Sequence, residues 1–196
     1  MLTDNEWLSE WGGLSAVGCP QREHGGKGND FLIPLMIKVT VLCIGKLKER
    51  YWREACDEYA KRLSAWCKFT IIELPESRLP ENPAPAQIER ALEEEGERLL
   101  SRAGNAEAYK AALCIEGKLA SSEGLAEDIA AAALAGKSEL VFFIGSSYGL
   151  SPGVKASAQK RLSMSPMTFP HQLARVMLCE QIYRAFQINK NGKYHK

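Results

Sequence analysis

The sequence is poor in the residue patterns that hold metals, form disulfides or cross membranes. Its three histidines and six cysteines do not cluster and no two cysteines have CxxC spacing, so neither a zinc site nor a redox motif is expected. No apolar run approaches the roughly 20 residues that span a bilayer. The first charged residues are acidic and no apolar segment follows them, unlike a secretory signal. We therefore expect a reduced, cytoplasmic protein without a metal or a membrane anchor.

Two nucleotide-binding motifs are also absent. The chain has neither the GxGxxG dinucleotide fingerprint nor the GxxxxGK[ST] phosphate loop, which disfavours NAD and nucleoside triphosphates as ligands.

Acidic residues are scarce in the C-terminal part of the chain. From Leu150 onward there are eight Lys and Arg but one acid, Glu180, whereas residues 1–149 carry 17 basic and 23 acidic side chains. Such segregation is typical of a protein with a polyanionic partner at its basic end. A set of solvated helix faces explains the charge equally well.

Apolar periodicity divides the chain into two parts. Residues 1–35 are Gly-rich without a sustained period, and we interpret them as an upstream-start extension or a weakly structured arm. Residues 36–196 form one predicted domain, with strands at 36–44, 69–74, 111–115, 140–144 and 162–164 and helices at 48–66, 86–102, 122–135, 151–158 and 170–186. This alternation predicts an α/β fold, a mostly parallel sheet with helices on both faces.

Three predicted loops, 115–118, 145–149 and 165–170, follow strands, where ligands bind in open α/β sheets. The glycines of the second allow close approach of its backbone to a ligand, although a plain turn explains them as well. In the third, Pro166 and Pro170 stiffen an arch that suits adenine recognition by main-chain groups. A rigid connector is the alternative for this arch.

Two helices carry more specific expectations. The helix 48–66 should bury a stripe formed by Tyr51, Ala55, Tyr59 and Leu63. The last helix is apolar over so much of its circumference that we expect cover from two directions, one of them a second subunit. Its Glu180 and Arg184 are one turn apart and should form an ion pair.

The chain resembles the RlmH methyltransferases of the SPOUT class over residues 36–196. The resemblance is carried by the strand that starts at Met36, by Phe143-Ile-Gly145 with Tyr148-Gly149, and by Met167-Thr-Phe-Pro-His171, Arg175, Glu180, Tyr183-Arg184 and Tyr194-His195-Lys196. It implies methylation of a pseudouridine at N3 in large-subunit ribosomal RNA, with S-adenosylmethionine (SAM) as cofactor. It also implies a C-terminal trefoil knot and a homodimer.

The resemblance further implies which residues act. The implied cofactor pocket consists of Ile115, Gly145, Ser146, Ser165, Pro166, Met167, Thr168, Phe169 and Pro170. Ser146 replaces a glycine that is usual in the family. His195 is the candidate base or anion-stabilising cation, and His171 organises the loop. Arg184 is a candidate for substrate positioning, and together with Tyr194, His195 and Lys196 for contacts with RNA. The tail of one subunit would complete the pocket of the other.

Two other functions are compatible with the same residues. One is a non-catalytic module that binds RNA or the ribosome but no SAM. The other is a knotted methyltransferase that acts on a different RNA.

Overall fold

The computed structural model describes residues 37–190. Ten elements follow one another: β1 (Lys38–Ile44), α1 (Arg50–Leu63), β2 (Lys68–Leu74), α2 (Pro85–Leu100), β3 (Tyr109–Leu119), α3 (Ser122–Leu134), β4 (Glu139–Ile144), α4 (Pro152–Ser157), β5 (Lys160–Ser163) and α5 (His171–Asn189). Each predicted strand and helix has its counterpart. The N-terminal arm and the tail residues Tyr194, His195 and Lys196 lie outside the described residues, so the predicted boundary at Met36 stays a prediction.

The five strands form one parallel sheet in the order β2-β1-β4-β3-β5. Every residue of β4 is buried, because this near-continuous apolar strand lies inside the sheet and is covered on both faces. All strands point the same way, so their carboxyl ends meet at one edge. The predicted parallel α/β sheet is confirmed, and the trefoil knot implied by the resemblance stays a prediction.

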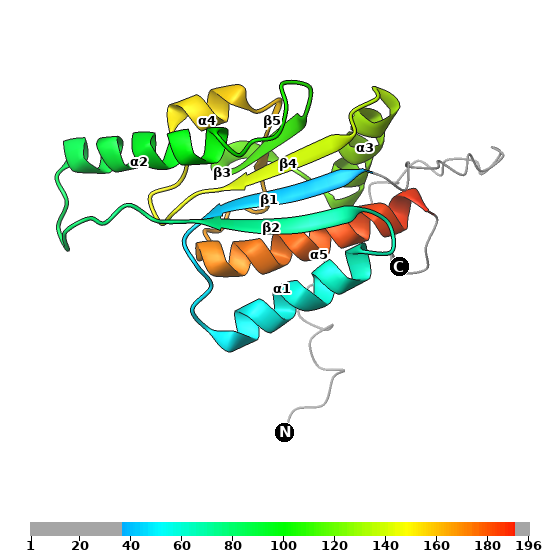
Figure 1. Cartoon of the computed structure of the whole chain (residues 1–196), viewed down its shortest axis with the longest axis horizontal. Coiled ribbons are helices and arrows are strands. Elements are labelled where there is room, and N and C mark those ends of the chain that lie inside the picture. Colours follow the sequence, from blue (N-terminus) through cyan, green and yellow to red (C-terminus); the bar gives the residue numbers. More distant parts are fainter. Residues whose placement is uncertain (1–36, 191–196) are drawn as a thin grey trace, which may run out of the picture.

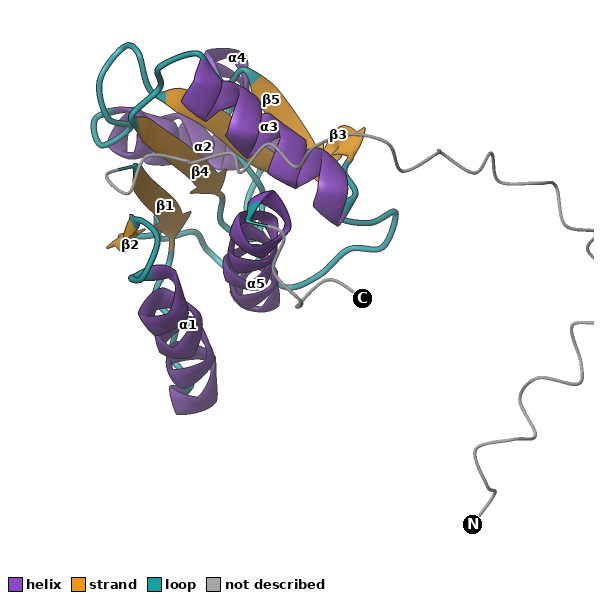
Figure 2. Cartoon of the chain, turned by 90° about the vertical axis from the view of Figure 1, so that its right-hand side faces the viewer, coloured by secondary structure: helices purple, strands orange, loops and turns teal. Residues whose placement is uncertain are grey.

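Helices cover both faces of the sheet, as predicted. In Figure 1, α2 and α4 lie above the sheet, where they enclose one apolar cluster. α1 and α5 lie below it, and α3 shares with them the larger cluster on that face. Figure 2 shows α5 between α1 and α3. The broad apolar surface of α5 is therefore covered largely by its own chain, which the periodicity had not shown.

The structure contradicts one predicted core residue. Tyr51 was predicted on the buried stripe of the first helix, yet it is 58% exposed, and its ring lies tilted by 57° against that of Trp52, with centroids 4.8 Å apart. α1 begins at Arg50, and Figure 1 shows this first turn lying away from the sheet. Leu63, at the other end of the same stripe, is fully buried.

The predicted loop 115–118 is also wrong, because β3 continues to Leu119. Its pairing with β5 shifts between Leu113 and Lys118, so the intervening residues leave the regular ladder. Gly117 permits this passage: a Cβ there would lie 2.6 Å from the carbonyl carbon of Leu162. The sequence Glu-Gly-Lys had suggested a turn, whereas the glycine serves a close approach of two strands.

Within residues 37–190, no helix combines the length and apolar character needed to cross a membrane.

Candidate functional site

A cavity of about 650 Å³ lies at the carboxyl ends of β3, β4 and β5. All three predicted segments contribute to its walls, namely the second half of β3, the turn after β4 and the arch before α5, and residues of α4, β5 and α5 complete them. The residues predicted for the cofactor that line it are Ile115, Gly145, Ser146, Ser165, Met167, Thr168, Phe169 and Pro170. Pro166 does not line it. The fold thus brings together residues that are up to 55 positions apart in sequence.

The turn after β4 is tighter than a plain Gly-rich connection. A Cβ on Gly145 would lie 2.0 Å from the carbonyl oxygen of Gly149, so no side chain fits there. The amide of Gly149 donates to the oxygen of Ser146 at 3.0 Å, and Gly149 has a left-handed φ of 90°. Glycine is therefore required at both ends of the turn. Ser146 is buried in the cavity wall between them.

Two serine hydroxyls order the arch. Ser165 Oγ accepts a hydrogen bond from the amide of Met167 at 3.0 Å, and Ser163 Oγ donates to the carbonyl oxygen of Ser165 at 3.1 Å. The side chain of Met167 is 70% exposed at the mouth of the cavity. The stiffness that the sequence analysis attributed to the prolines thus has a second source in these hydroxyls.

The wall of the same cavity also contains an ion pair. Glu116 on β3 bonds to Lys155 on α4, and both residues line the cavity. The bond to Lys155 lowers the pKa of the Glu116 carboxyl, which keeps it ionised at neutral pH. Sequence reasoning gave neither residue a role. The only indication of a site was that each residue lies near the end of a predicted strand or the start of a predicted helix.

His171 begins α5 and lines the cavity. Burial lowers the pKa of its imidazole, an effect that nearby Glu76 opposes and Arg175 reinforces. The ring is accordingly neutral at neutral pH. One turn later, Arg175 is fully buried and donates to Glu73 and to the carbonyl oxygen of Gly45. No role was predicted for Arg175, and the available signal was a single charge between Ala174 and Val176 on an apolar helix.

Arg184 lies farther along α5. Its Nε and Nη2 donate to Glu180 Oε1 at 3.0 and 2.6 Å, which confirms the predicted ion pair. Arg184 does not line the cavity. Three other C-terminal cations pair with acids from earlier in the chain: Lys155 with Glu116, Lys160 with Asp128, and Arg175 with Glu73. The fold therefore offsets part of the charge segregation seen in the sequence.

No three His, Cys, Asp or Glu side chains gather into a possible metal site within the described part of the chain.

A parallel α/β domain with a glycine turn, a proline arch and a cavity at its strand ends matches a known class. The family model described as predicted SPOUT methyltransferase matches residues 37–195, and the chain belongs to that family. It is 44% identical over 160 residues to the ribosomal RNA large subunit methyltransferase H of Exiguobacterium sibiricum, and 45% identical over 160 residues to that of Levilactobacillus brevis. Each alignment covers 82% of this chain and all of the relative.

Solved structures give a more distant likeness. The SpoU methyltransferase AviRb from Streptomyces viridochromogenes matches 79% of this chain at 12% identity with a TM-score of 0.41. Its complex with AdoMet matches 86% at 13% identity with a TM-score of 0.43. The chain spans 61% and 64% of those two structures.

Proposed function

We propose that the protein transfers a methyl group from SAM to N3 of a pseudouridine in large-subunit ribosomal RNA. The observation that carries the proposal is the cavity at the strand ends, whose walls contain eight of the nine residues expected to hold the cofactor. Membership of the methyltransferase family and the names of two full-length relatives support the same activity. We also assign the protein to the cytoplasm, in keeping with a ribosomal RNA substrate.

The residues around the cavity fit SAM. A volume of about 650 Å³ accommodates a ligand of that size. Leu113, Leu162 and Phe169 offer apolar contact to an adenine ring, and the backbone of the arch can recognise its edge. The Glu116 carboxylate can accept hydrogen bonds from ribose hydroxyls. When bound, SAM supplies a methyl group activated by a positive sulfonium.

The chain must align the acceptor nitrogen and remove its proton. During transfer a nitrogen–carbon bond forms at N3 as the carbon–sulfur bond breaks, the sulfonium becomes a thioether, and the N3 proton goes to a base. The walls of the cavity would hold SAM in one orientation, and positioning of this kind can supply much of the rate enhancement. We assign the base, or the cation that stabilises the N3 anion, to His195.

The length of α5 argues that His195 acts on a partner subunit. His171 lines the cavity at the start of α5, and the helix of 19 residues carries the chain about 28 Å away, at 1.5 Å per residue. From Asn189 to His195, a fully extended chain covers about 21 Å. Because about 21 Å is less than about 28 Å, even a fully extended tail that ran back along α5 would not reach the start of the helix. In a homodimer each tail can enter the cavity of the partner subunit instead, and it then need not return along its own helix.

The outer side of α1 offers a surface for such a dimer. Tyr51 is exposed and Trp52 is half-buried there. An apolar surface of this kind suits a two-fold dimer. Arg184 lies on α5, and we assign it, with Tyr194 and Lys196 of the tail, to contacts with RNA.

The activity is tested by mass spectrometry of ribosomal RNA from a strain that lacks the gene. Loss of one methyl group on a large-subunit pseudouridine, restored by the purified protein with SAM, is the expected result. Loss from a different RNA would identify the other knotted methyltransferase. Absence of SAM binding in calorimetry would instead favour a non-catalytic RNA- or ribosome-binding module.

A further inference from the structure

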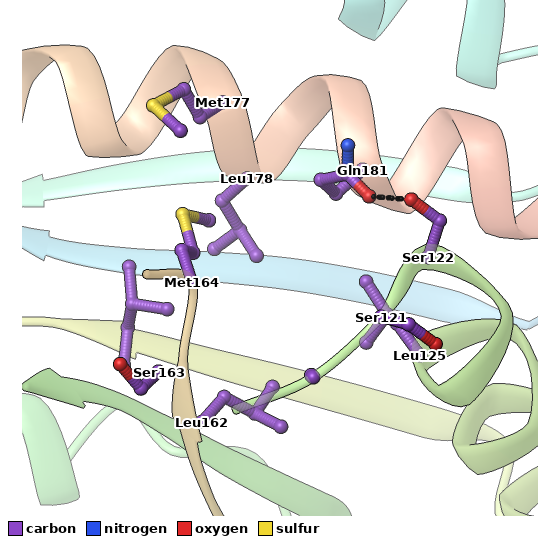
Figure 3. Close-up of a pocket in the computed structure, with 11 residues that line it drawn as sticks. Ser121, Ser122, Leu125, Leu162, Ser163, Met164, Met177, Leu178 and Gln181 are labelled. Carbon is purple, nitrogen blue, oxygen red and sulfur yellow. Dashed lines mark hydrogen bonds between the residues drawn. The ribbon is translucent and has the colours of Figure 1, made fainter. Parts of the chain in front are cut away.

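A second, smaller cavity adjoins the proposed cofactor site. It has a volume of about 250 Å³ and lies between the end of β5, the start of α3 and the middle of α5 (Figure 3). It shares four wall residues with the larger cavity: Leu113, Leu162, Ser163 and Met164. Ligands in the two cavities would thus lie on either side of the same side chains. Apart from the helix and strand pattern, nothing in the sequence drew attention to this place.

The lining of this cavity favours a flat, neutral ligand. None of the described residues that line it is charged, so the site does not suit a phosphate or another anion. Leu125 and Leu178 form apolar walls, and Met164 and Met177 extend into the space between β5 and α5 (Figure 3). Methionine side chains are flexible and make favourable contacts with aromatic rings.

In one wall, Ser122 and Gln181 can form hydrogen bonds with the edge of a ring. The hydroxyl of Ser122 donates to Oε1 of Gln181 at 2.7 Å, which joins α3 to α5 (Figure 3). Gln181 Nε2 donates to Glu180 at 2.6 Å. An amide beside a hydroxyl offers both donors and acceptors, as needed for a ring edge on which an N–H adjoins a carbonyl. The volume is below the range of about 300–1,000 Å³ typical of drug-sized ligands, which suits a single ring.

We propose that the smaller cavity receives the nucleobase that is methylated, after it leaves the RNA stack. This inference rests on the proposed function. Enzymes that modify bases commonly take the target into a snug pocket, where its Watson–Crick edge is hydrogen-bonded and its faces contact apolar side chains. Here Gln181 and Ser122 bind the side of the ring that carries N1–H and a carbonyl, which leaves N3 for the methyl group, and the methionines contact the ring. Met164 lines both cavities, so it lies where the base and the cofactor would meet.

The test compares two glutamines on one helix. Gln181→Met keeps the side-chain volume but removes the polar edge of the cavity. Gln187→Met is the matched control, because Gln187 bonds to the hydroxyl of Tyr183 at 2.8 Å and lines neither cavity. For each full-length variant, methyl transfer from labelled SAM to large ribosomal subunits of the deletion strain gives kcat/KM, and calorimetry gives the Kd for SAM. Ser122→Ala is a second, milder variant.

We expect Gln181→Met to lower kcat/KM for the subunits about tenfold or more, as loss of one hydrogen bond to the substrate would. Its Kd for SAM should stay within about twofold of the wild-type value, and its thermal midpoint should match that of Gln187→Met. Ser122→Ala should change kcat/KM in the same direction.

Equal kcat/KM for the two glutamine variants would overturn the proposal. A weakened Kd for SAM in Gln181→Met would also overturn it, because the cavity would then belong to the cofactor. If the wild-type protein binds no SAM or methylates no ribosomal RNA, it is the proposed function that fails.

Discussion

Arg175 and Glu73 form an ion pair between residues 102 positions apart, with 2.5 Å between Nη1 and Oε1. The arginine side chain is fully buried and its Nη2 also donates to the carbonyl oxygen of Gly45 at 2.9 Å. Glu73 accepts a further hydrogen bond from the amide of Leu47. The pair thereby fixes the start of α5, which follows the arch, against the ends of β1 and β2. The arch is thereby anchored through the first turn of the helix that it precedes.

Replacement of Glu73 by alanine should destabilise the protein by about 3–5 kcal/mol, because Arg175 would keep a buried charge without its partner. Urea unfolding followed by circular dichroism measures this change. The matched control is Glu54→Ala, which removes an exposed partner of Arg50 and should cost at most about 0.5 kcal/mol. Equal losses for the two variants would show that the buried pair does not stabilise the start of α5.

Gly145→Ala should weaken SAM binding at least about tenfold, or about 1.4 kcal/mol. The added Cβ would lie 2.0 Å from the Gly149 oxygen, so the turn must open and displace the cavity wall. Calorimetry measures the Kd. Gly153→Ala is the control, because its Cβ meets no atom closer than Ser151 Oγ at 3.9 Å. Unchanged affinity in Gly145→Ala would argue against this turn as part of the cofactor site.

Cys114 should react with N-ethylmaleimide before the other cysteines among residues 37–190, and SAM should slow that reaction several-fold. Cys114 is half-buried in the cavity wall. Burial raises the pKa of Cys114 as well as those of Cys43 and Cys67, so its accessibility distinguishes it from the buried Cys43, Cys56, Cys67 and Cys179. Peptide mass spectrometry after timed labelling measures each site separately. Labelling of Cys114 at the same rate with and without SAM would place the cofactor elsewhere.

A mixture of His195→Ala and Gly145→Ala subunits should be more active than either variant alone. In a two-fold dimer with shared sites, random mixing gives heterodimers with one intact site and so about a quarter of wild-type turnover. The measurement is methyl transfer after the two variants are unfolded and refolded together. Sites completed within one chain would give no recovery, since each chain then lacks either its cavity turn or its base.

The order of strands and helices followed from local pattern. β1 and β4 are runs of apolar residues bounded by polar ones, and such runs predict buried parallel strands whatever lies around them. The glycine turn and the proline arch were also visible, because these residue types constrain the backbone directly. The Glu180–Arg184 pair needed only helical spacing. These features depend on residues close together in the chain.

What the sequence left undecided depends on residues far apart. It could not show that Gly117 lets β3 pass β5, that Arg175 meets Glu73, or that α1 and α3 cover α5, because each involves a partner distant in sequence. The cavity beside Gln181 exists only where three elements meet. Local pattern thus determined the elements and the candidate cofactor segments. Only the tertiary packing determined which side chains of different elements lie next to one another.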